Sequence, residues 1–480
     1  MESIWTQTCE IPARKALPGD EKTEVAVIGA GMAGLLIADA LANAGYRVTV
    51  LEADRIAGGQ TRNTTAKITS QHGPSYRQRL QTLGLEKAKQ YAAANEAALA
   101  EYRRLILKRG IDCELEEQEA CVYGMDPQAL RAEAEAAAKL GLPASFREQT
   151  GLPFPTAGAV CFAHQAQFHP LKFLKAIAEP LNIYEKTPVK RVQDHRLVTD
   201  LGTVTADKIV FACHYPFVNF PGMFFARMHQ ERSYVLALEN AGIPDGMWIG
   251  SGKEPFSLRH YGDLVLLGGG DHRCGDNRKG GRYEILRLRA REWFPNSRER
   301  AHWSAQDCVT ADGVPYIGKY AESRPDWYVA TGFQKWGMTG SMVSAMLLRD
   351  AICGGENPYA DAFAPSRFNA ETAAGVAGET GHAIKGLTKH FFQIPWEQAK
   401  DIPPDHGGIV FFRGKKLGVY KDTDGKLYPV SVFCPHLGCQ LEWNPDERSW
   451  DCLCHGSRFD RFGNRISGPA ETSTSPAHKN

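Results

Sequence analysis

Four residues near the end of the chain have the spacing of a metal site. Cys434 and His436 form one pair, and after 15 further residues Cys452 and His455 form a second. Each pair supplies one thiolate and one imidazole, so the four can hold zinc or an iron–sulfur cluster. Structural zinc sites favour CxxC or HxxxH pairs, whereas two Cys on one iron and two His on the other define a Rieske [2Fe–2S] centre. We predict the Rieske centre, with zinc as the alternative.

The two loops, CPHLGC and CLCHGS, resemble those of Rieske proteins from respiratory cytochrome bc complexes, and the resemblance covers residues 389–480. It implies a disulfide between Cys439 and Cys454. It also implies that the Ser457 hydroxyl bonds a cluster sulfur. The family has a tyrosine two positions further on, where this chain has Phe459. Since one hydrogen bond near the cluster is then missing, we expect a redox potential below the respiratory type.

A second signature stands at the other end of the chain. Gly29, Gly31 and Gly34 form G-x-G-x-x-G between the apolar run EVAVIG and a helical pattern, and Glu52 ends the next apolar run. Such glycines let backbone N–H groups approach a pyrophosphate, and the acidic residue accepts the ribose hydroxyls. The pattern predicts a dinucleotide site for NAD or FAD.

FAD is favoured by a resemblance to the amino-acid and amine oxidase superfamily, which includes D-amino-acid, sarcosine and glycine oxidases. The Gly/Thr-rich stretch 52–73, the Asp-Gly-x-Pro-x-x-Gly element at 312–318 and the glycine-rich loop 330–340 carry it, in the family's order. The resemblance implies FAD contacts from Thr65, Ala66, Val189, Asp312, Gly337, Met338 and Thr339. Backbone N–H groups of the last loop would face the negative charge of reduced flavin. We expect the FAD to be non-covalent and Cys308 to be an ordinary buried cysteine.

Four residues are candidates for catalysis. Lys67 and His72 lie in the stretch that the family wraps near the flavin, His272 follows a strand in the substrate half, and Lys335 lies in the loop before the last helix. Each also has a simpler interpretation. Lys67 could pair with a phosphate or carboxylate, both histidines could be ordinary hydrogen-bonded residues, and Lys335 could be a solvated charge.

These motifs need an α/β fold: an FAD-binding Rossmann-type domain interleaved with a mixed-sheet substrate domain, followed by an all-β Rieske domain. The predicted units are an N-terminal arm (1–23), a flavin domain (24–370), a linker without large apolar residues (371–388) and the Rieske domain (389–480). Within the flavin domain, we assign FAD binding to about 24–80, 160–215 and 305–370, and substrate binding mainly to 216–304.

Composition is that of a soluble globular protein, with 480 residues, 43% of them hydrophobic, and a net charge of +1. The balance favours neither nucleic acid nor a membrane surface as partner, no apolar run is long enough to span a membrane, and we expect a cytoplasmic protein. Eight cysteines stand outside the cluster motif and are expected to be mostly small buried residues: Cys9, Cys113, Cys121, Cys161, Cys213, Cys274, Cys308 and Cys353.

Taken together, the motifs predict an FAD-dependent dehydrogenase that oxidises a small amine or amino acid by hydride transfer. Electrons would pass singly to the chain's own Rieske cluster and then to an external protein or quinone-like acceptor. The whole chain resembles a bacterial group that joins these two domains. The alternative is an electron-transfer relay, or a reductase component that feeds a partner oxygenase.

Overall fold

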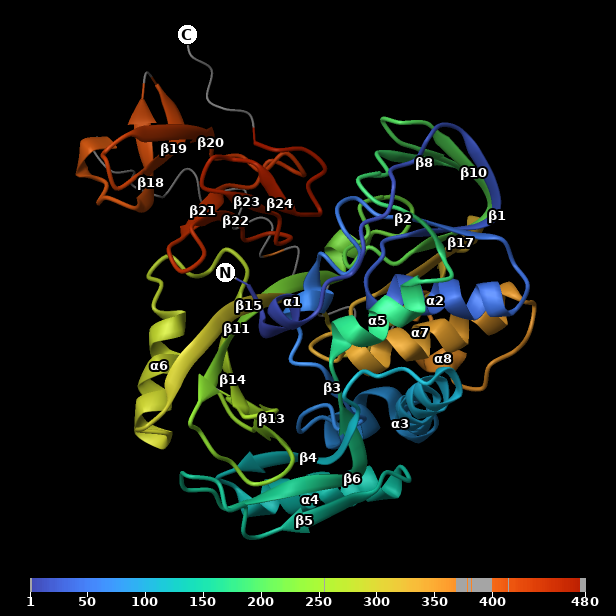
Figure 1. Ribbon diagram of the computed structural model, residues 1–480, viewed down its shortest axis with the longest axis vertical. Coiled ribbons are helices and arrows are strands. Elements are labelled where there is room, and N and C mark those ends of the chain that lie inside the picture. The colour runs from blue at the N-terminus through green and yellow to red at the C-terminus, as the bar shows by residue number, and fades with distance from the viewer. Residues whose placement is uncertain are drawn as a thin grey trace.

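The computed structural model describes residues 2–253, 255–367, 399–412 and 414–474, together with Gly378 and Gly381. Two large sheets and their helices occupy the part up to residue 367, and two small sheets form the C-terminal part above them (Figure 1). Most of the predicted linker, 371–388, lies outside the described residues. Among those described, no helix is both long and apolar enough to cross a membrane.

The first large sheet has a parallel centre, as the glycine motif requires. Its order is β16 (Tyr316–Ala321), β17 (Arg324–Thr331), β10 (Thr203–Phe211), β1 (Glu21–Ile28), β2 (Val48–Leu51) and β7 (Asn182–Tyr184), with β8 (Arg191–Gln193) and β9 (Arg196–Val198) beside β10. Helices α2 (Met32–Asn43), α5 (Pro170–Ala178) and α7 (Gly337–Ile352) gather on one side of it (Figure 1). The C-terminal halves of β1 (25–28) and β10 (209–211) are continuous apolar runs and are buried, as expected of central parallel strands that are covered on both faces.

The second large sheet is mixed and takes strands from more of the chain than residues 216–304. Its order is β15 (Arg298–Thr310), β11 (Met228–Glu239), β14 (Leu264–Arg273), β13 (Ser257–Tyr261), β12 (Met247–Gly250), β4 (Glu116–Gly124), β6 (Gly158–Gln167) and β3 (Lys67–Ile68), with β5 (Ala144–Arg147) paired to β6. Five of these strands fall outside 216–304, either wholly or in part. The chain therefore crosses between the sheets more often than its motifs reveal.

Helices and short turns complete the flavin-domain part. They are α1 (Ile4–Thr8), α3 (Tyr76–Arg109), α4 (Pro127–Lys139), α6 (Arg282–Trp293), α8 (Ala360–Phe363) and the 3₁₀ turns η1 (Gln60–Asn63) and η2 (Phe224–Ala226). The long helix α3 is broken at Gly84, whose φ of 74° is left-handed. Glycine adopts this conformation without steric cost, which explains why the helix changes direction there.

The C-terminal part is all-β, as predicted. One sheet contains β18 (His406–Phe412), β19 (Lys415–Lys421) and β20 (Leu427–Ser431), and η3 (Ala399–Asp401) precedes it. The other contains β21 (Leu441–Asn444), β22 (Ser449–Cys452), β23 (Arg458–Asp460) and β24 (Arg465–Ser467). A tight turn, in which the Gly425 N–H donates to the Asp422 carbonyl at 3.1 Å, joins β19 to β20. Trp450 is fully buried in a shared core.

The N-terminal arm is more ordered than its polar sequence suggests. Trp5 in α1 is fully buried, and its ring N–H donates to the Thr64 carbonyl at 2.7 Å. The Ser3 hydroxyl donates to the Arg62 carbonyl. The arm therefore fixes the loop that begins the predicted flavin-contacting stretch.

Two of the cysteines expected to be small buried residues are buried and also form a disulfide. Cys121 on β4 and Cys161 on β6 are direct partners in an antiparallel pair, with Cα atoms 4.1 Å apart. Their separation of 40 residues forms no motif, so only the strand register reveals the pair. Among the cysteines left free, Cys113, Cys274 and Cys308 are buried as expected, whereas Cys353 is exposed.

Candidate flavin site and metal centre

The first glycine motif forms a turn that only glycine fits. Gly29 has a φ of 106°, and a Cβ there would lie 2.6 Å from the Ala212 carbonyl oxygen. A Cβ on Gly34 would lie 1.8 Å from the Gly29 carbonyl oxygen. The carboxylate of Glu52 accepts from the N–H groups of Ala30, at 2.7 Å, and Asp54, at 2.8 Å. Burial raises the pKa of Glu52 despite these bonds.

Two helix N-termini can face a bound anionic group. Gly31 precedes α2 without a side-chain cap, although the Met32 N–H donates to the Thr61 hydroxyl at 3.0 Å. Gly337 begins α7, which also lacks a side-chain cap. Backbone N–H groups at such termini suit a pyrophosphate or a reduced flavin, so both ends of the predicted FAD site fit the cofactor.

An arginine that the sequence did not single out joins the predicted flavin loop to the second sheet. Arg259 on β13 is buried and donates to the carbonyls of Thr65, at 2.6 Å, and Ala66, at 2.9 Å. Burial lowers its pKa to about 9. The predicted flavin loop therefore contacts β13, and the residues next to Arg259 in the sequence form no pattern that predicts this contact.

Lys67 lies beside this arginine. Its Nζ is 3.2 Å from the Thr65 hydroxyl and 3.5 Å from the Ser257 hydroxyl. Burial, with a smaller contribution from the charge of Arg259, lowers the pKa of Lys67 to about 7. Within the described part of the chain, no carboxylate forms an ion pair with Lys67 or Arg259. Glu116 and Glu114 act on Arg259 only at longer range, so these two buried basic groups lie together without a contacting anion among the described residues, which is costly unless one binds.

The Asp-Gly element is held by an internal ion pair. Arg367 donates to Asp312 at 2.7 Å through Nε and at 3.0 Å through Nη2. The Val314 N–H donates to the same carboxylate at 3.2 Å. Asp312 therefore shapes the turn through these bonds, and a direct FAD contact would have to come from its backbone. Val189 is half-buried against the core beside the first sheet.

His72 belongs to a closed hydrogen-bond network. Its Nδ1 is 2.6 Å from the Tyr91 hydroxyl, and its Nε2 is 2.7 Å from the Thr69 carbonyl and 3.1 Å from the Thr339 hydroxyl. The ring stacks on Trp336 with centroids 4.7 Å apart. Burial holds the pKa of His72 well below its ordinary value. The geometry therefore favours a neutral histidine that packs the loop against α7.

His272 lies near the end of β14, in a network that reaches the C-terminal domain. Its Nε2 is 3.0 Å from the Tyr234 hydroxyl, and its Nδ1 is 2.7 Å from the Arg273 carbonyl. Asn277 contacts the same hydroxyl at 3.4 Å and donates to Asn444 of the Rieske domain at 3.0 Å. The structure thus places His272 near the domain interface.

Lys335 is surrounded by carboxylates. Its Nζ lies 3.4 Å from Asp271, 3.8 Å from Glu231 and 3.9 Å from Asp307. These charges outweigh burial and raise the pKa of Lys335. Burial raises the pKa of Asp307 to about 6, although Lys335 opposes it. The charge of Lys335 is therefore already matched, in contrast to that of Lys67.

The four predicted cluster ligands come together. Cys434 and Cys452 are buried, and the rings of His436 and His455 are 4.9 Å apart at 89°. The Nδ1 atom of His436 is buried and has no hydrogen bond among the described residues. The pKa of Cys434 is lowered to about 7, chiefly by a hydrogen bond from the Cys452 thiol, and burial opposes this. Two sulfurs and two imidazoles with such an unsatisfied nitrogen fit a [2Fe–2S] cluster bound through Nδ1.

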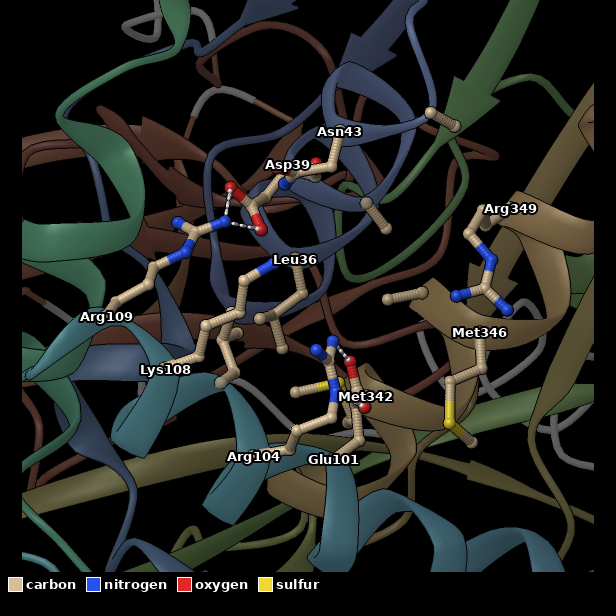
Figure 2. A pocket seen from close by; sticks show the side chains of 14 residues that line it. Leu36, Asp39, Asn43, Glu101, Arg104, Lys108, Arg109, Met342, Met346 and Arg349 are labelled. Carbon is tan, nitrogen blue, oxygen red and sulfur yellow. Dashed lines mark hydrogen bonds and ion pairs between the residues drawn. The ribbon is translucent and has the colours of Figure 1, made fainter.

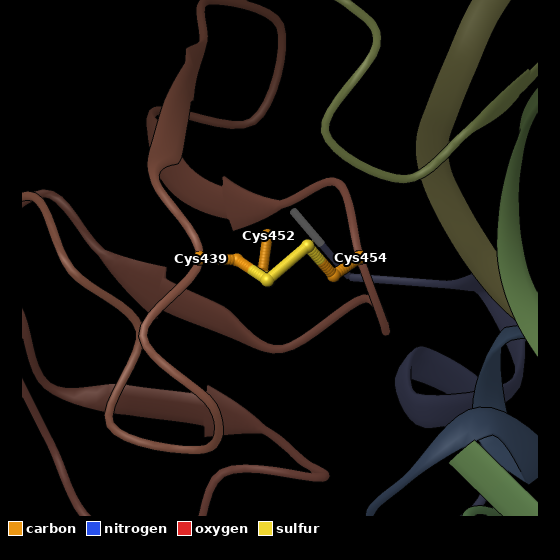
Figure 3. A group of neighbouring side chains, drawn as sticks. All are labelled: Cys439, Cys452 and Cys454. Atoms are coloured by element: carbon orange, nitrogen blue, oxygen red, sulfur yellow. A yellow bond between two sulfur atoms is a disulfide. The ribbon is translucent and has the colours of Figure 1, made fainter. Parts of the chain in front are cut away.

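The disulfide implied by the resemblance is present. Cys439 and Cys454 are bonded, and Cys452 lies directly beside them (Figure 3). The bond ties the two ligand loops together at positions separated by 15 residues. Because both sulfurs are used in it, neither is available as a cluster ligand.

Ser457 is placed to stabilise the thiolate side of the site. It is fully buried, and its oxygen accepts from the Ala470 N–H at 2.9 Å. Its hydroxyl also contributes to lowering the pKa of Cys434. Phe459 is fully buried and offers no hydroxyl.

We expect opposite shifts in midpoint potential from two substitutions. Ser457→Ala removes a donor to cysteine sulfur, which disfavours the reduced cluster and lowers the potential. Phe459→Tyr restores the missing hydroxyl and raises it. Each shift should be up to about tenfold in the redox equilibrium, or about 59 mV for one electron. An EPR-monitored redox titration at equal iron content measures both. An unchanged potential in Phe459→Tyr, or a parent potential at the respiratory level, contradicts the expectation.

Two surface hollows lie away from these sites. One of about 270 Å³ lies between α2, α3 and α7 (Figure 2), and one of about 950 Å³ adjoins it beside α5. Their charges are largely paired, since Arg109 bonds Asp39 and Arg104 bonds Glu101. They contain none of the predicted site residues.

The fold and the two sites define a flavoprotein oxidoreductase with its own Rieske centre. Residues 24–351 match the family described as FAD dependent oxidoreductase, and residues 393–477 match the Rieske [2Fe-2S] domain. The chain belongs to this FAD-dependent oxidoreductase family and carries a C-terminal Rieske domain. FAD and a [2Fe–2S] cluster are its cofactors.

A relative of the whole chain is a protein of Bacillus subtilis (strain 168) described as a Rieske 2Fe-2S iron-sulfur protein, YhfW. It is 36% identical over 98% of this chain and 96% of its own length. Cytochrome b6-f complex iron-sulfur subunit 1 of Cyanophora paradoxa is 32% identical over 28% of this chain and 56% of its own length.

Solved structures share the fold of the flavin domain. Glycine oxidase from Geobacillus kaustophilus has a TM-score of 0.61 at 20% identity and covers 72% of this chain and 99% of its own. L-proline dehydrogenase from P. horikoshii has a TM-score of 0.63 at 18% identity and covers 73% of this chain and 98% of its own. At this identity the likeness establishes the architecture of the domain.

Proposed function

We propose that this protein is an FAD-dependent dehydrogenase of a small amino acid, and that its substrate carboxylate binds between Lys67 and Arg259. The observation that carries the proposal is this pair of buried cations without a carboxylate partner among the described residues. A simple amine would bring no anion into contact with Lys67 and Arg259, whereas an amino acid brings its carboxylate.

The residues have distinct tasks in this proposal. FAD, when bound, accepts a hydride from the substrate α-carbon, and the cluster carries the electrons singly to a one-electron acceptor. Lys67 and Arg259 hold the carboxylate and so orient the α-carbon. Arg259 also holds the Thr65–Ala66 backbone, which couples the substrate anchor to the flavin loop. The substrate must bind as the neutral amine for its C–H bond to break as hydride while the C=N bond forms.

An anaerobic experiment tests the proposal. The holoprotein is mixed with a panel of amino acids, N-methyl amino acids, the corresponding decarboxylated amines and NADH or NADPH. Flavin bleaching and the EPR signal of the reduced cluster are followed together. We expect an amino acid to bleach the flavin, its decarboxylated amine to fail, and the cluster signal to rise after the flavin is reduced.

Other outcomes overturn the proposal. Equal reduction by an amine and its parent amino acid removes the role of the carboxylate. Reduction only by NADH, NADPH or a protein donor identifies the chain as a relay or reductase component.

A further inference from the structure

Both predicted histidine ligands of the cluster lie against the flavin domain. His436 contacts Asn219 in the loop between β10 and η2, and the backbone of His455 contacts Gln230 on β11. We propose that Asn219 and Gln230 are positioning residues for the cluster, so that the flavin domain completes the hydrogen-bond shell of its own Rieske centre. Only the role of this contact in electron transfer from the flavin to the cluster rests on the proposed function.

Asn219 determines the environment of the first histidine. Its Oδ1 is 3.1 Å from His436 Nε2. With the buried and unsatisfied Nδ1 of His436 toward the cluster, Nε2 would carry the proton and donate to Asn219 Oδ1. A carbonyl acceptor at this position orients the imidazole and raises its basicity toward the metal. A more basic ligand stabilises the oxidised cluster, so this contact lowers the potential.

A chain of buried amides holds the second histidine. Gln230 donates to the carbonyls of His455, at 2.6 Å, and Gly468, at 3.2 Å. Gln306 on β15 donates to Gln230 and, at 2.8 Å, to the Gly456 carbonyl. Both glutamines are almost completely buried, and buried amides retain such bonds because leaving them unmade is costly.

The same chain extends into the predicted flavin loop. The Gln306 backbone N–H donates to the Gln60 side chain at 2.7 Å. Gln60 begins η1, between the first glycine motif and Lys67. The hydrogen bonds therefore run from the loop that surrounds the flavin to the ligand loop of the cluster.

The backbones at this interface approach too closely to accommodate side chains. A Cβ on Gly275 would lie 2.5 Å from the Leu453 backbone nitrogen, and one on Gly456 would lie 2.6 Å from Gln230 Cβ. Both glycines also have left-handed φ values. The close packing of the two domains therefore depends on glycine in both of them, at Gly275 in the flavin domain and at Gly456 in the Rieske domain.

Asn219→Ala tests the inference in the full-length holoprotein. We expect it to raise the cluster midpoint potential, with up to a tenfold change in the redox equilibrium, while iron content and flavin potential stay at parent values. The EPR g-values should move, since the donor–acceptor geometry at one ligand changes. Asn219→Asp keeps an acceptor and should not raise the potential. None of these measurements uses a substrate, so they succeed or fail independently of the proposed substrate.

Asn277→Ala is the matched control. Asn277 bonds Asn444 and Asp446 across the same interface but contacts neither histidine ligand. We expect the midpoint potential and the EPR spectrum of the cluster in Asn277→Ala to match those of the parent protein. If Asn219→Ala shows no shift at full iron content, or if Asn277→Ala shifts the potential equally, the interface holds the domain without positioning the ligands and the inference is wrong.

Discussion

Lys67→Met is expected to weaken the binding of a carboxylate ligand by about tenfold to a hundredfold. The estimate follows from losing one charge-assisted hydrogen bond, about 1.5–3 kcal/mol, at about 1.4 kcal/mol per factor of ten. Lys67 is buried beside Arg259 without an anionic partner among the described residues. The measurement is a titration of the flavin absorption spectrum with an unreactive carboxylate such as acetate or benzoate.

Carboxylate binding should also depend on pH, in a direction that follows from the pKa of Lys67. The pKa of Lys67 is lowered to about 7, so in the free protein the side chain is charged below pH 7 and neutral above it. A bound carboxylate favours the charged form and raises that pKa. Affinity for the anion should therefore be constant below pH 7 and fall by up to tenfold per pH unit above it. In Lys67→Met this decline should disappear.

Lys175→Met provides the matched control, because it removes the same charge from an exposed position on α5. Its carboxylate affinity and pH profile should equal those of the parent. If Lys67→Met instead loses FAD while the remaining holoprotein binds carboxylates normally, the anion between the two cations is the cofactor.

Features that lie within a short stretch of chain were predictable. The cluster ligands, the disulfide between Cys439 and Cys454 and the first glycine motif each depend on local spacing or a family motif, and the structure brings each of them together. Two short loops carry the predicted ligands, so the spacing of Cys and His within each loop is enough to predict that they lie close in space.

Residues that act across long sequence distances could not be found this way. Arg259 reaches Thr65 across 194 positions, and Asn219 reaches His436 across 217. Their neighbours in sequence form ordinary strand or loop patterns, and only the strand order brings them to the site. The same reason explains the unpredicted bond between Cys121 and Cys161, since it depends on β4 pairing with β6.

The interface also contains a buried ion network. Arg232 on β11 donates to Glu447 of the Rieske domain at 2.8 Å, and Arg458 lies 3.2 Å from Glu447 and 3.1 Å from Asp451. Arg232, Arg458 and Asp451 are buried, and the side chain of Glu447 is 9% exposed. Burial opposes ionisation of Glu447, but Arg232 and then Arg458 outweigh it and lower its pKa. Its contribution to stability should therefore persist above the ordinary glutamate pKa and be lost as the pH falls through the lowered value.

Arg232→Met should destabilise the docked protein by about 3–5 kcal/mol, because it leaves Glu447 buried with only part of its compensation. Adding Glu447→Gln to this variant removes the uncompensated charge and should recover part of the loss. Chemical unfolding of the holoprotein, followed by tryptophan fluorescence and by the visible spectrum of the cluster, measures both effects. Arg104→Met breaks an exposed pair with Glu101 and should cost less than about 1 kcal/mol. If Arg232→Met lowers the free energy of unfolding no more than Arg104→Met does, the network contributes little to docking. If the effects of Arg232→Met and Glu447→Gln on that free energy simply add, Arg232 acts through a contact other than Glu447.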